Sequence, residues 1–175
     1  MNIYLLGTGS AVATSERDNS SIFFKSNDFN ILIDCSGSTV HKISKLGLDF
    51  KDIQNVLITH FHPDHVYGLP SLIHSLAPYD KFPVIYAPDN LINNIYELMK
   101  VFGFENNVTI LSVKKLIQQY NFIDIFPTRH TEDSIGVILD YEGKKTVYTS
   151  DTGPINNLHH KISGCNYLIH DCYAP

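Results

Sequence analysis

Apolar and polar segments along this chain are short and follow one another closely. Runs rich in Ile, Val, Phe and Tyr, many of them bounded by turn residues, are typical of β-strands. We predict strands at Asn2–Leu6, Ser21–Lys25, Asn30–Asp34, Asn55–Thr59, Val84–Ala87, Val108–Leu111, Phe122–Phe126, Ile135–Tyr141, Thr146–Tyr148 and Tyr167–His170. Helical patterns interrupt these strands at Thr39–Leu46, Leu69–Leu76, Asn90–Phe102 and Pro154–Ile162. Hairpins early in the chain and helices between the later strands predict an α/β fold, a sandwich of sheets with helices outside.

No tandem repeat, low-complexity tract or flexible linker marks a boundary within the chain. With 175 residues, 43% of them apolar and 18% charged, the chain has enough material for one sizeable core. We therefore expect residues 1–175 to form a single domain. The segment Tyr141–Lys145 predicts a hairpin turn, in which Gly143 supplies the permissive backbone.

The formal charge of −5 gives no general attraction to nucleic acid, although bound metal ions would reverse the sign locally. The first residues are apolar only briefly and lack a basic region, and no later run approaches the roughly 20 apolar residues of a membrane span. The three cysteines are spaced unlike zinc-finger pairs, so reduced thiols are expected. The composition indicates a soluble, cytoplasmic protein with no membrane partner.

Metal-binding side chains are concentrated at Thr59–His65, which reads THFHPDH and follows an apolar strand. Because Pro63 removes a backbone donor, the strand should end there and the donors should lie on a tight loop. Imidazole and carboxylate groups suit Zn²⁺, Mn²⁺ or Fe. The alternate residues His60 and His62 can face one ion, and the adjacent Asp64 and His65 can face another. Burial of these four groups without a metal would leave polar atoms unpaired.

Two later strand ends add candidate ligands of the same kind. His130 follows one predicted strand and Asp151 follows the hairpin after it. A third imidazole from His130 would complete three nitrogen ligands on the first ion, and the carboxylate of Asp151 could bridge both ions. Other histidines lie apart from any second signal and are expected to be surface or packing residues: His41, His74, His159 and His160.

The order of these motifs resembles the metallo-β-lactamase superfamily, whose signature is an HxHxDH loop followed by a single histidine and a bridging aspartate. The resemblance covers essentially the whole chain. The segments LLGTGSAVATSERDNSS and FNILIDCSGST resemble most closely the ribonuclease Z branch, the tRNA 3′-processing endonucleases and related phosphodiesterases. The resemblance implies an αβ/βα four-layer sandwich with a dinuclear site along one edge. It implies the following ligands: His60, His62 and His130 on the first ion, Asp64 and His65 on the second, and Asp151 between them.

Other residues near these motifs have predicted supporting roles. Gly7 and Gly9 allow a tight turn near the site or belong to an ordinary turn. Asp34 either orients the histidine loop through hydrogen bonds or caps its strand. His170 and Asp171 resemble the family's strand that ends in His-Glu, where the acid supports a proton-donating histidine. In this chain the acid is one methylene shorter.

The chain departs from the family pattern at two places. The family's His-Ser-Thr type motif and final metal-binding histidine lie further towards the C-terminus than Pro175. We therefore expect a C-terminally incomplete domain and a second ion that is weaker, replaced by water or missing. An ending at Tyr173–Pro175, directly after a core strand, would expose a sheet surface that the family covers with further strands and helices. Between His130 and Asp151 the chain has only a short turn where some ribonuclease Z enzymes insert a tRNA-gripping arm. Its absence weakens the case for tRNA, since nucleic-acid affinity depends on Lys and Arg.

Three functions remain in competition. The first is a metal-dependent hydrolase that cleaves a small phosphodiester or RNA. Its site would hold two Zn²⁺ ions, or Mn²⁺ or Fe in their place, and Asp64 would also orient the attacking water. The second keeps the metals but cleaves a thioester, lactone or β-lactam. The third is a non-catalytic metal-binding subunit. The resemblance also implies a homodimer, to which the apolar segment Leu69–Tyr79 contributes unless it packs in the core.

Overall fold

The computed structural model describes residues 1–172, in two compact units, Met1–Ser112 and Val113–Pro175. Each unit contains its own β-sheet. The expectation of an exposed surface at Tyr173–Pro175 lies outside the described residues. Whether the two units form the single predicted domain stays a prediction.

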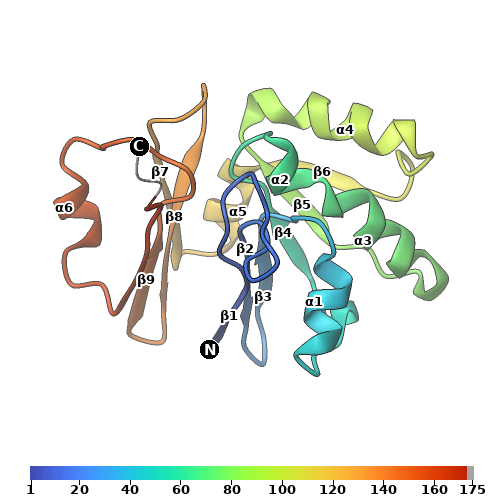
Figure 1. Cartoon of the computed structure of the whole chain (residues 1–175), viewed down its shortest axis with the longest axis horizontal. Coiled ribbons are helices and arrows are strands. Elements are labelled where there is room, and N and C mark those ends of the chain that lie inside the picture. Colours follow the sequence, from blue (N-terminus) through green and yellow to red (C-terminus); the bar gives the residue numbers. More distant parts are fainter. Residues whose placement is uncertain (173–175) are drawn as a thin grey trace. The chain divides into compact units, whose positions relative to one another are not determined.

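The first unit is built on a six-stranded sheet whose strands lie side by side in sequence order (Figure 1). Strands β1 to β3 are antiparallel, and β3 to β6 are parallel. The strands are β1 (Asn2–Gly7), β2 (Ser21–Lys25), β3 (Asn30–Ile33), β4 (Asn55–Leu57), β5 (Val84–Ala87) and β6 (Thr109–Ser112). Because β3 and β4 are parallel, their carboxyl ends meet at the same edge of the sheet. Asp34 and the Thr59–His65 segment leave the sheet at this edge.

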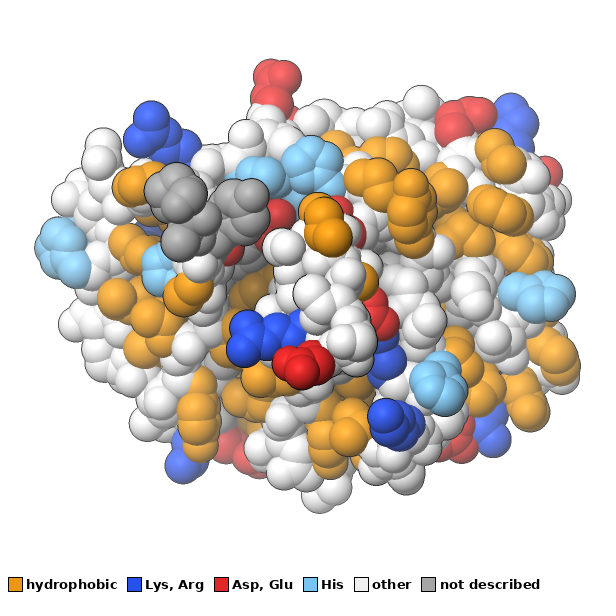
Figure 2. Space-filling view, viewed as in Figure 1, with side chains coloured by type: hydrophobic (Ala, Val, Ile, Leu, Met, Phe, Trp, Pro, Cys, Tyr) orange, Lys and Arg blue, Asp and Glu red, His pale blue; other side chains and the backbone are white. Residues whose placement is uncertain are grey.

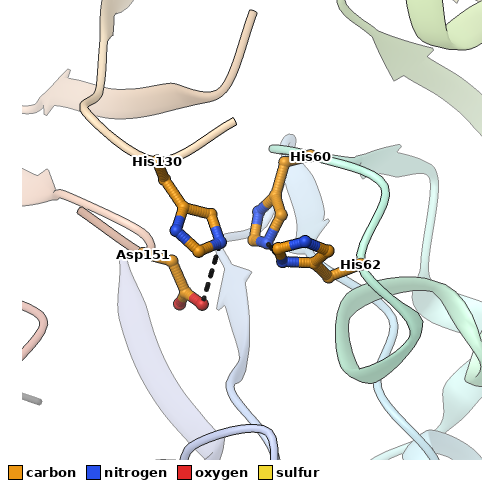
Figure 3. Close-up of side chains that lie close together, drawn as sticks. All are labelled: His60, His62, His130 and Asp151. Atoms are coloured by element: carbon orange, nitrogen blue, oxygen red, sulfur yellow. Dashed lines mark hydrogen bonds and ion pairs between the residues drawn. The ribbon is translucent and has the colours of Figure 1, made fainter. Parts of the chain in front are cut away.

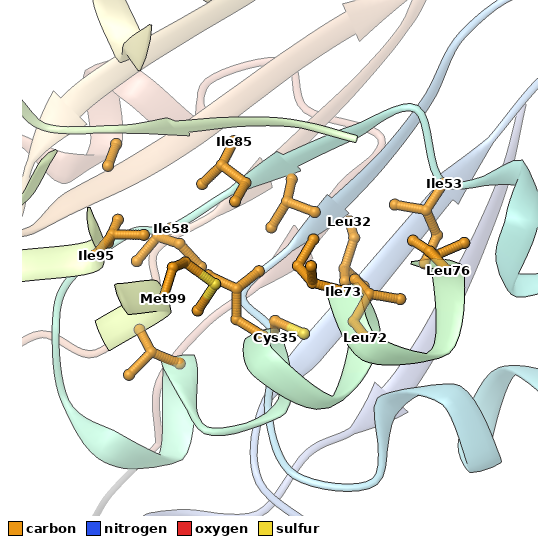
Figure 4. Close-up of a cluster of buried hydrophobic side chains, with 14 of the residues drawn as sticks. Leu32, Cys35, Ile53, Ile58, Leu72, Ile73, Leu76, Ile85, Ile95 and Met99 are labelled. Atoms are coloured by element: carbon orange, nitrogen blue, oxygen red, sulfur yellow. The ribbon is translucent and has the colours of Figure 1, made fainter. Parts of the chain in front are cut away.

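Helices connect the parallel strands of this unit and cover one face of its sheet (Figure 1). They are α1 (Thr39–Lys45), η1 (Phe50–Asp52), α2 (Pro63–Val66), α3 (Gly68–Leu76), η2 (Ala77–Tyr79), η3 (Asp89–Leu91) and α4 (Ile92–Val101). Figure 4 shows the apolar cluster between these layers, in which Leu32 and Ile85 of the sheet pack with Leu72 of α3 and Met99 of α4. Burial of this cluster stabilises the sheet edge from which the histidine segment emerges.

The apolar segment Leu69–Tyr79 contributes chiefly to this core. Four of its side chains are buried there, namely Leu69, Leu72, Ile73 and Leu76. Tyr79, at the end of the segment, is 51% exposed. Core packing therefore accounts for most of the apolar pattern, and the segment offers little apolar surface to a partner.

Gly68 lies where the backbone of α3 meets the turn after β3. Its N–H donates to the carbonyl of Cys35 at 2.8 Å, and the Cys35 N–H donates to the carbonyl of His65 at 2.8 Å. A Cβ on Gly68 would lie 2.0 Å from the carbonyl oxygen of Ser36, closer than any real contact. The missing side chain thus allows the helix that carries His65 to dock directly on the sheet edge.

Replacement of Gly68 by alanine is expected to push α2 and α3 away from this turn. Overpacking against backbone should reduce the free energy of unfolding by about 2–3 kcal/mol, measured by urea denaturation. Gly37→Ala is the matched control, since a Cβ at Gly37 meets nothing within 4 Å. Equal stability of the two variants would contradict this account.

The second unit is a four-stranded sheet in the order β10-β9-β8-β7. Its elements are α5 (Val113–Gln119), β7 (Ile123–Pro127), β8 (Ile135–Tyr141), β9 (Lys144–Tyr148), α6 (Leu158–Ile162) and β10 (Tyr167–Ile169). Strand β8 is antiparallel to both β7 and β9, so the carboxyl ends of β7 and β9 lie at one edge of this sheet. The predicted hairpin turn is confirmed: Glu142 and Gly143, with φ of 52° and 71°, connect β8 to β9.

The predicted strands all form, with ends that differ by a few residues, but three helices differ from prediction. The predicted helix Pro154–Ile162 forms only at Leu158–Ile162. Helix α5 was not predicted, although Val113 and Leu116 have helical spacing and are buried. Asp64 and His65 lie on the short helix α2 rather than on a loop. Pro63 ends the strand as predicted, but it then occupies the first helical turn, where its fixed φ is favourable and no N–H is needed. Within residues 1–172, no helix is long and apolar enough to cross a membrane.

Candidate metal centre

Two imidazoles of the first unit come together just beyond β4. His60 is fully buried and His62 is partly exposed. The Nε2 atom of His60 lies 3.1 Å from the Nδ1 atom of His62, and the two rings are nearly perpendicular, at 83°. One nitrogen of each imidazole therefore faces the same small space.

The carboxylate of Asp34 orients the histidine segment from the neighbouring strand end. Asp34 has a left-handed backbone, with φ of 57°, and is fully buried. Its Oδ1 accepts from the Thr59 N–H at 2.8 Å, and its Oδ2 lies 2.8 Å from Nδ1 of His65. The Thr59 hydroxyl lies 2.9 Å from the same Oδ2 and 3.1 Å from Nδ1 of His60. The predicted contact between Asp34 and the histidine segment is present in the structure.

These contacts select the protonation pattern of two rings. A carboxylate is an acceptor only, so the Thr59 hydroxyl and the Nδ1–H of His65 both donate to Asp34. The oxygen of Thr59 then accepts from Nδ1–H of His60. When the two rings are neutral, this arrangement leaves Nε2 as the unprotonated nitrogen, the form that binds metal in carboxylate–histidine–metal triads.

A second donor pair lies on helix α2. Nε2 of His65 is 3.5 Å from Oδ2 of Asp64, and both side chains are largely buried. Asp64 lies in the first turn of the helix, where the backbone N–H groups favour a negative charge. This pair is formed by different atoms from those that join His60 to His62, so the segment presents two separate donor pairs.

The second unit supplies a third pair. His130 follows β7 and Asp151 follows β9, at the edge where these two strands end. Nε2 of His130 lies 3.6 Å from Oδ2 of Asp151, the contact drawn as a dashed line in Figure 3. Figure 3 also draws His60 and His62 of the first unit. Both members of the third pair are partly exposed, at 28% and 32% of their side chains.

The loops that carry His130 and Asp151 are tied together by hydrogen bonds. The N–H of Arg129 donates to the hydroxyl of Thr152 at 3.0 Å, and the N–H of Gly153 donates to the carbonyl of Arg129 at 2.8 Å. The N–H of Thr152 donates in turn to Oδ2 of Asp171 at 3.1 Å. Asp171 therefore supports the loop of Asp151.

The neighbouring His170 takes part in a separate contact. Its Nδ1 atom lies 3.2 Å from the hydroxyl oxygen of Thr149. That hydroxyl also accepts from the N–H of Asp171 at 3.1 Å. The predicted support of a proton-donating His170 by Asp171 stays a prediction.

Replacement of Thr152 by valine should loosen this connection without changing the volume of the side chain. The N–H of Arg129 would lose its acceptor, which should cost about 1 kcal/mol of the free energy of unfolding. We also expect metal to be lost more easily to a chelator. Thr109→Val, at an exposed position of β6, is the control. Unchanged chelator resistance in Thr152→Val would show that the two loops are held by other contacts.

The three donor pairs have the spacing of neighbouring ligands around one ion. Metal–ligand distances of about 2.0–2.2 Å in a tetrahedral shell place adjacent donors about 3.4 Å apart. The observed separations are 3.1, 3.5 and 3.6 Å. Imidazole and carboxylate are also the donor types that suit such a metal. The donors therefore fit a divalent transition metal.

The roles of Thr59 and Thr152 were not predicted. Each is a hydroxyl residue directly adjacent to a predicted ligand in the sequence, and only the fold shows which atom it faces. Four other histidines lie on the surface, as predicted: His41, His74, His159 and His160.

The cysteines have different environments in the structure. All three are free, as predicted; Cys35 is buried and Cys172 is exposed. Burial raises the pKa of the Cys35 thiol to about 12, and the nearby Asp34 acts in the same direction. Only the thiolate is nucleophilic. At pH 8 we expect a disulfide reagent to modify Cys172 quickly and Cys35 only after unfolding, measured by peptide mass spectrometry. Rapid labelling of Cys35 in the folded protein would contradict its burial.

Comparison with known proteins connects this geometry to a family. Residues 1–174 match the family described as "Anti-Pycsar protein Apyc1". A ribonuclease Z of Saccharolobus islandicus is 24% identical over 220 aligned positions, which cover 98% of this chain and 76% of the relative.

Two solved structures share the fold. Human tRNase Z, short form, has a TM-score of 0.76 at 22% identity, covering 96% of this chain and 76% of that one. Zn²⁺-bound PqqB from Methylobacterium extorquens has a TM-score of 0.79 at 17% identity, covering 98% and 72%. These similarities confirm the predicted metallo-β-lactamase fold. The chain belongs to the Apyc1 family, a metal-dependent hydrolase among the ribonuclease Z-like members of the metallo-β-lactamase superfamily.

Proposed function

We propose that the protein is a phosphodiesterase with a dinuclear metal site. Zinc is the metal proposed, with Mn²⁺ or Fe as alternatives that His/Asp donors also accept. The proposed ligands are His60, His62 and His130 on the first ion, Asp64 and His65 on the second, and Asp151 shared between them.

One observation carries this assignment. The three donor pairs found within the separate units are the pairs that the assignment places on a common ion. His60 with His62 and His130 with Asp151 belong to the first ion, and Asp64 with His65 belongs to the second. Their separations of 3.1, 3.6 and 3.5 Å match adjacent ligands.

The residues of the chain have distinct tasks in the proposed reaction. Bound metal ions would lower the pKa of a coordinated water and neutralise charge that develops on the phosphoryl group. Asp34 and Thr59 hold His60 and His65 in the tautomer that binds metal. The Oδ2 atom of Asp64 faces His65, so its Oδ1 would accept a proton from the attacking water.

The second ion has fewer protein ligands than the first in this assignment. Within residues 1–172, the ligands assigned to it are Asp64, His65 and the shared Asp151. We therefore propose that it binds more weakly, because affinity falls with ligand number. Titration of Zn²⁺ into the metal-free protein, monitored by calorimetry, should resolve a tight and a weak site. Two sites of equal affinity would contradict the assignment.

We propose a small phosphodiester, rather than tRNA, as the substrate. The connection between β8 and β9 is a turn at Glu142 and Gly143, with no arm to hold an RNA. The alignment with the S. islandicus ribonuclease Z has 220 positions, more than the 175 residues of this chain, so the relative carries insertions. On the face drawn in Figure 2, Lys and Arg side chains are scattered among acidic ones and form no basic patch. Large RNA affinity requires such a patch.

A substrate panel tests the proposal. The full chain, loaded with Zn²⁺ or Mn²⁺, would be assayed on bis(p-nitrophenyl) phosphate, 3′,5′-cyclic mononucleotides, a precursor tRNA, a lactone and a thioester. We expect turnover of the small phosphodiesters and little cleavage of the precursor tRNA. Hydrolysis of the lactone or thioester far faster than of any phosphodiester would overturn the proposal.

We further propose a cytoplasmic homodimer. Because most apolar side chains of Leu69–Tyr79 are in the core, an interface would have to use other surfaces, such as the exposed Val101 and Phe102 at the end of α4. Light scattering after size-exclusion chromatography tests the oligomeric state. A monomer at micromolar concentration would refute this part of the proposal.

A further inference from the structure

Arg129 is an exposed cation directly before His130, and its backbone is fixed on both sides. Its N–H donates to the hydroxyl of Thr152, and its carbonyl accepts from the N–H of Gly153. The Cα of Arg129 is thus held in a defined position beside the loop of Asp151.

The side chain of Arg129 follows the same loop. A Cβ placed on Gly153 would lie 3.8 Å from Cδ and 4.0 Å from Cγ of Arg129, so the aliphatic stem lies beside Gly153. The stem is therefore next to the loop that carries Asp151. Packing of the stem also lowers the entropy that the side chain would lose on binding a ligand.

The guanidinium group itself remains available. None of the ion pairs among residues 1–172 involves Arg129, although acidic side chains such as Glu132 and Asp133 follow it closely in sequence. The residue is exposed. An arginine with a fixed backbone, a packed stem and no internal partner for its charge is suited to an anionic ligand.

We propose that Arg129 binds the non-bridging oxygens of the substrate's phosphodiester group. This inference rests on the proposed function and makes it more specific. The planar guanidinium presents two parallel N–H donors that match the geometry of two phosphate oxygens. A neutral carbonyl substrate offers no such charge. Arg129 therefore selects substrates that are anionic at the scissile group, in a protein whose net charge of −5 otherwise repels them.

Three variants of the full, metal-loaded chain test this role: Arg129→Gln, Arg129→Lys and, as a control, Lys144→Gln. Lys144 is an exposed cation of the same unit, at the opposite end of β9 from the loop of Asp151, so its replacement removes the same charge. We expect Arg129→Gln to reduce kcat/KM for bis(p-nitrophenyl) phosphate about tenfold to a hundredfold, mainly through KM. Arg129→Lys should recover part of the loss, and Lys144→Gln should stay within about twofold of the parent.

A binding measurement separates this role from catalysis and from folding. Inorganic phosphate, titrated calorimetrically, should bind Arg129→Gln about tenfold or more weakly than the parent at equal zinc content. Equal phosphate affinity and equal KM in parent and Arg129→Gln would overturn the inference. Loss of zinc from Arg129→Gln would also overturn it, because the residue would then support the fold. If the parent binds phosphate through Arg129 but cleaves no phosphodiester, the proposed function fails while the anion site stands.

Discussion

His60→Ala is expected to reduce phosphodiester hydrolysis on the order of 10³-fold or more. His60 is the buried member of the first donor pair and lies at the centre of the histidine cluster, with its ring 4.8 Å from His62 and 4.1 Å from His65 between centroids. In the proposed assignment, its removal would leave the first ion with two imidazoles in place of three. The proposed activation of water depends on that ion, so activity should fall together with zinc content.

The measurement combines kcat/KM with zinc content determined by mass spectrometry. Treatment of the parent with a chelator should reproduce the loss, and added Zn²⁺ should restore activity to the parent but not to His60→Ala. His41→Ala, at an exposed histidine of α1, serves as the control and should behave like the parent. A His60→Ala variant that keeps both metal and activity would remove the foundation of the proposed site.

Asp34→Asn should weaken metal binding about tenfold to a hundredfold, although Asp34 itself is not a proposed ligand. The carboxylate accepts from three donors: the N–H and hydroxyl of Thr59, and Nδ1–H of His65. An asparagine has one acceptor oxygen, so its amide N–H₂ would face another donor. We also expect a loss of about 2–4 kcal/mol in the free energy of unfolding, because the site is buried.

The change to asparagine isolates the carboxylate from the backbone. Asp34 has a φ of 57°, and asparagine tolerates this left-handed conformation as well as aspartate does. Asp80 has a φ of 50° and is exposed, so Asp80→Asn makes the same chemical change in the same backbone conformation without a buried network. Zinc affinity and urea denaturation should change only at Asp34. Equal behaviour of the two variants would show that Asp34 does not orient the histidines.

Local chemistry made the sheet strands predictable. The runs that became β2, β3 and β5 are apolar and β-branched or aromatic, and such residues favour a buried pleated strand in any context. Helix α5 was harder to detect, since its seven residues are short for a periodic pattern, and burial of Val113 and Leu116 in the fold is what defines it. Helix α2 could not be predicted from Pro63 alone, because a proline can end a strand and can also occupy the first turn of a helix.

The candidate ligands could be identified from residue type and spacing, because few structures other than a metal site use so many imidazoles and carboxylates within six positions. The supporting residues could not. Thr59 and Thr152 are ordinary hydroxyl residues in sequence, and their roles depend on the atoms of Asp34, His60 and Arg129 that the fold brings to them.

By itself, the sequence determined the α/β class, the strands and the set of candidate metal-binding side chains, because these follow from local propensity and from the chemistry of each side chain. The tertiary structure alone decided which donors pair, which imidazole nitrogen faces Asp34 or Thr59 and where Arg129 lies. Those properties depend on contacts between segments far apart in the chain, such as Asp34 with His65 and Arg129 with Thr152. These contacts form because β3 and β4 end at one edge of the first sheet, and β7 and β9 end at one edge of the second sheet.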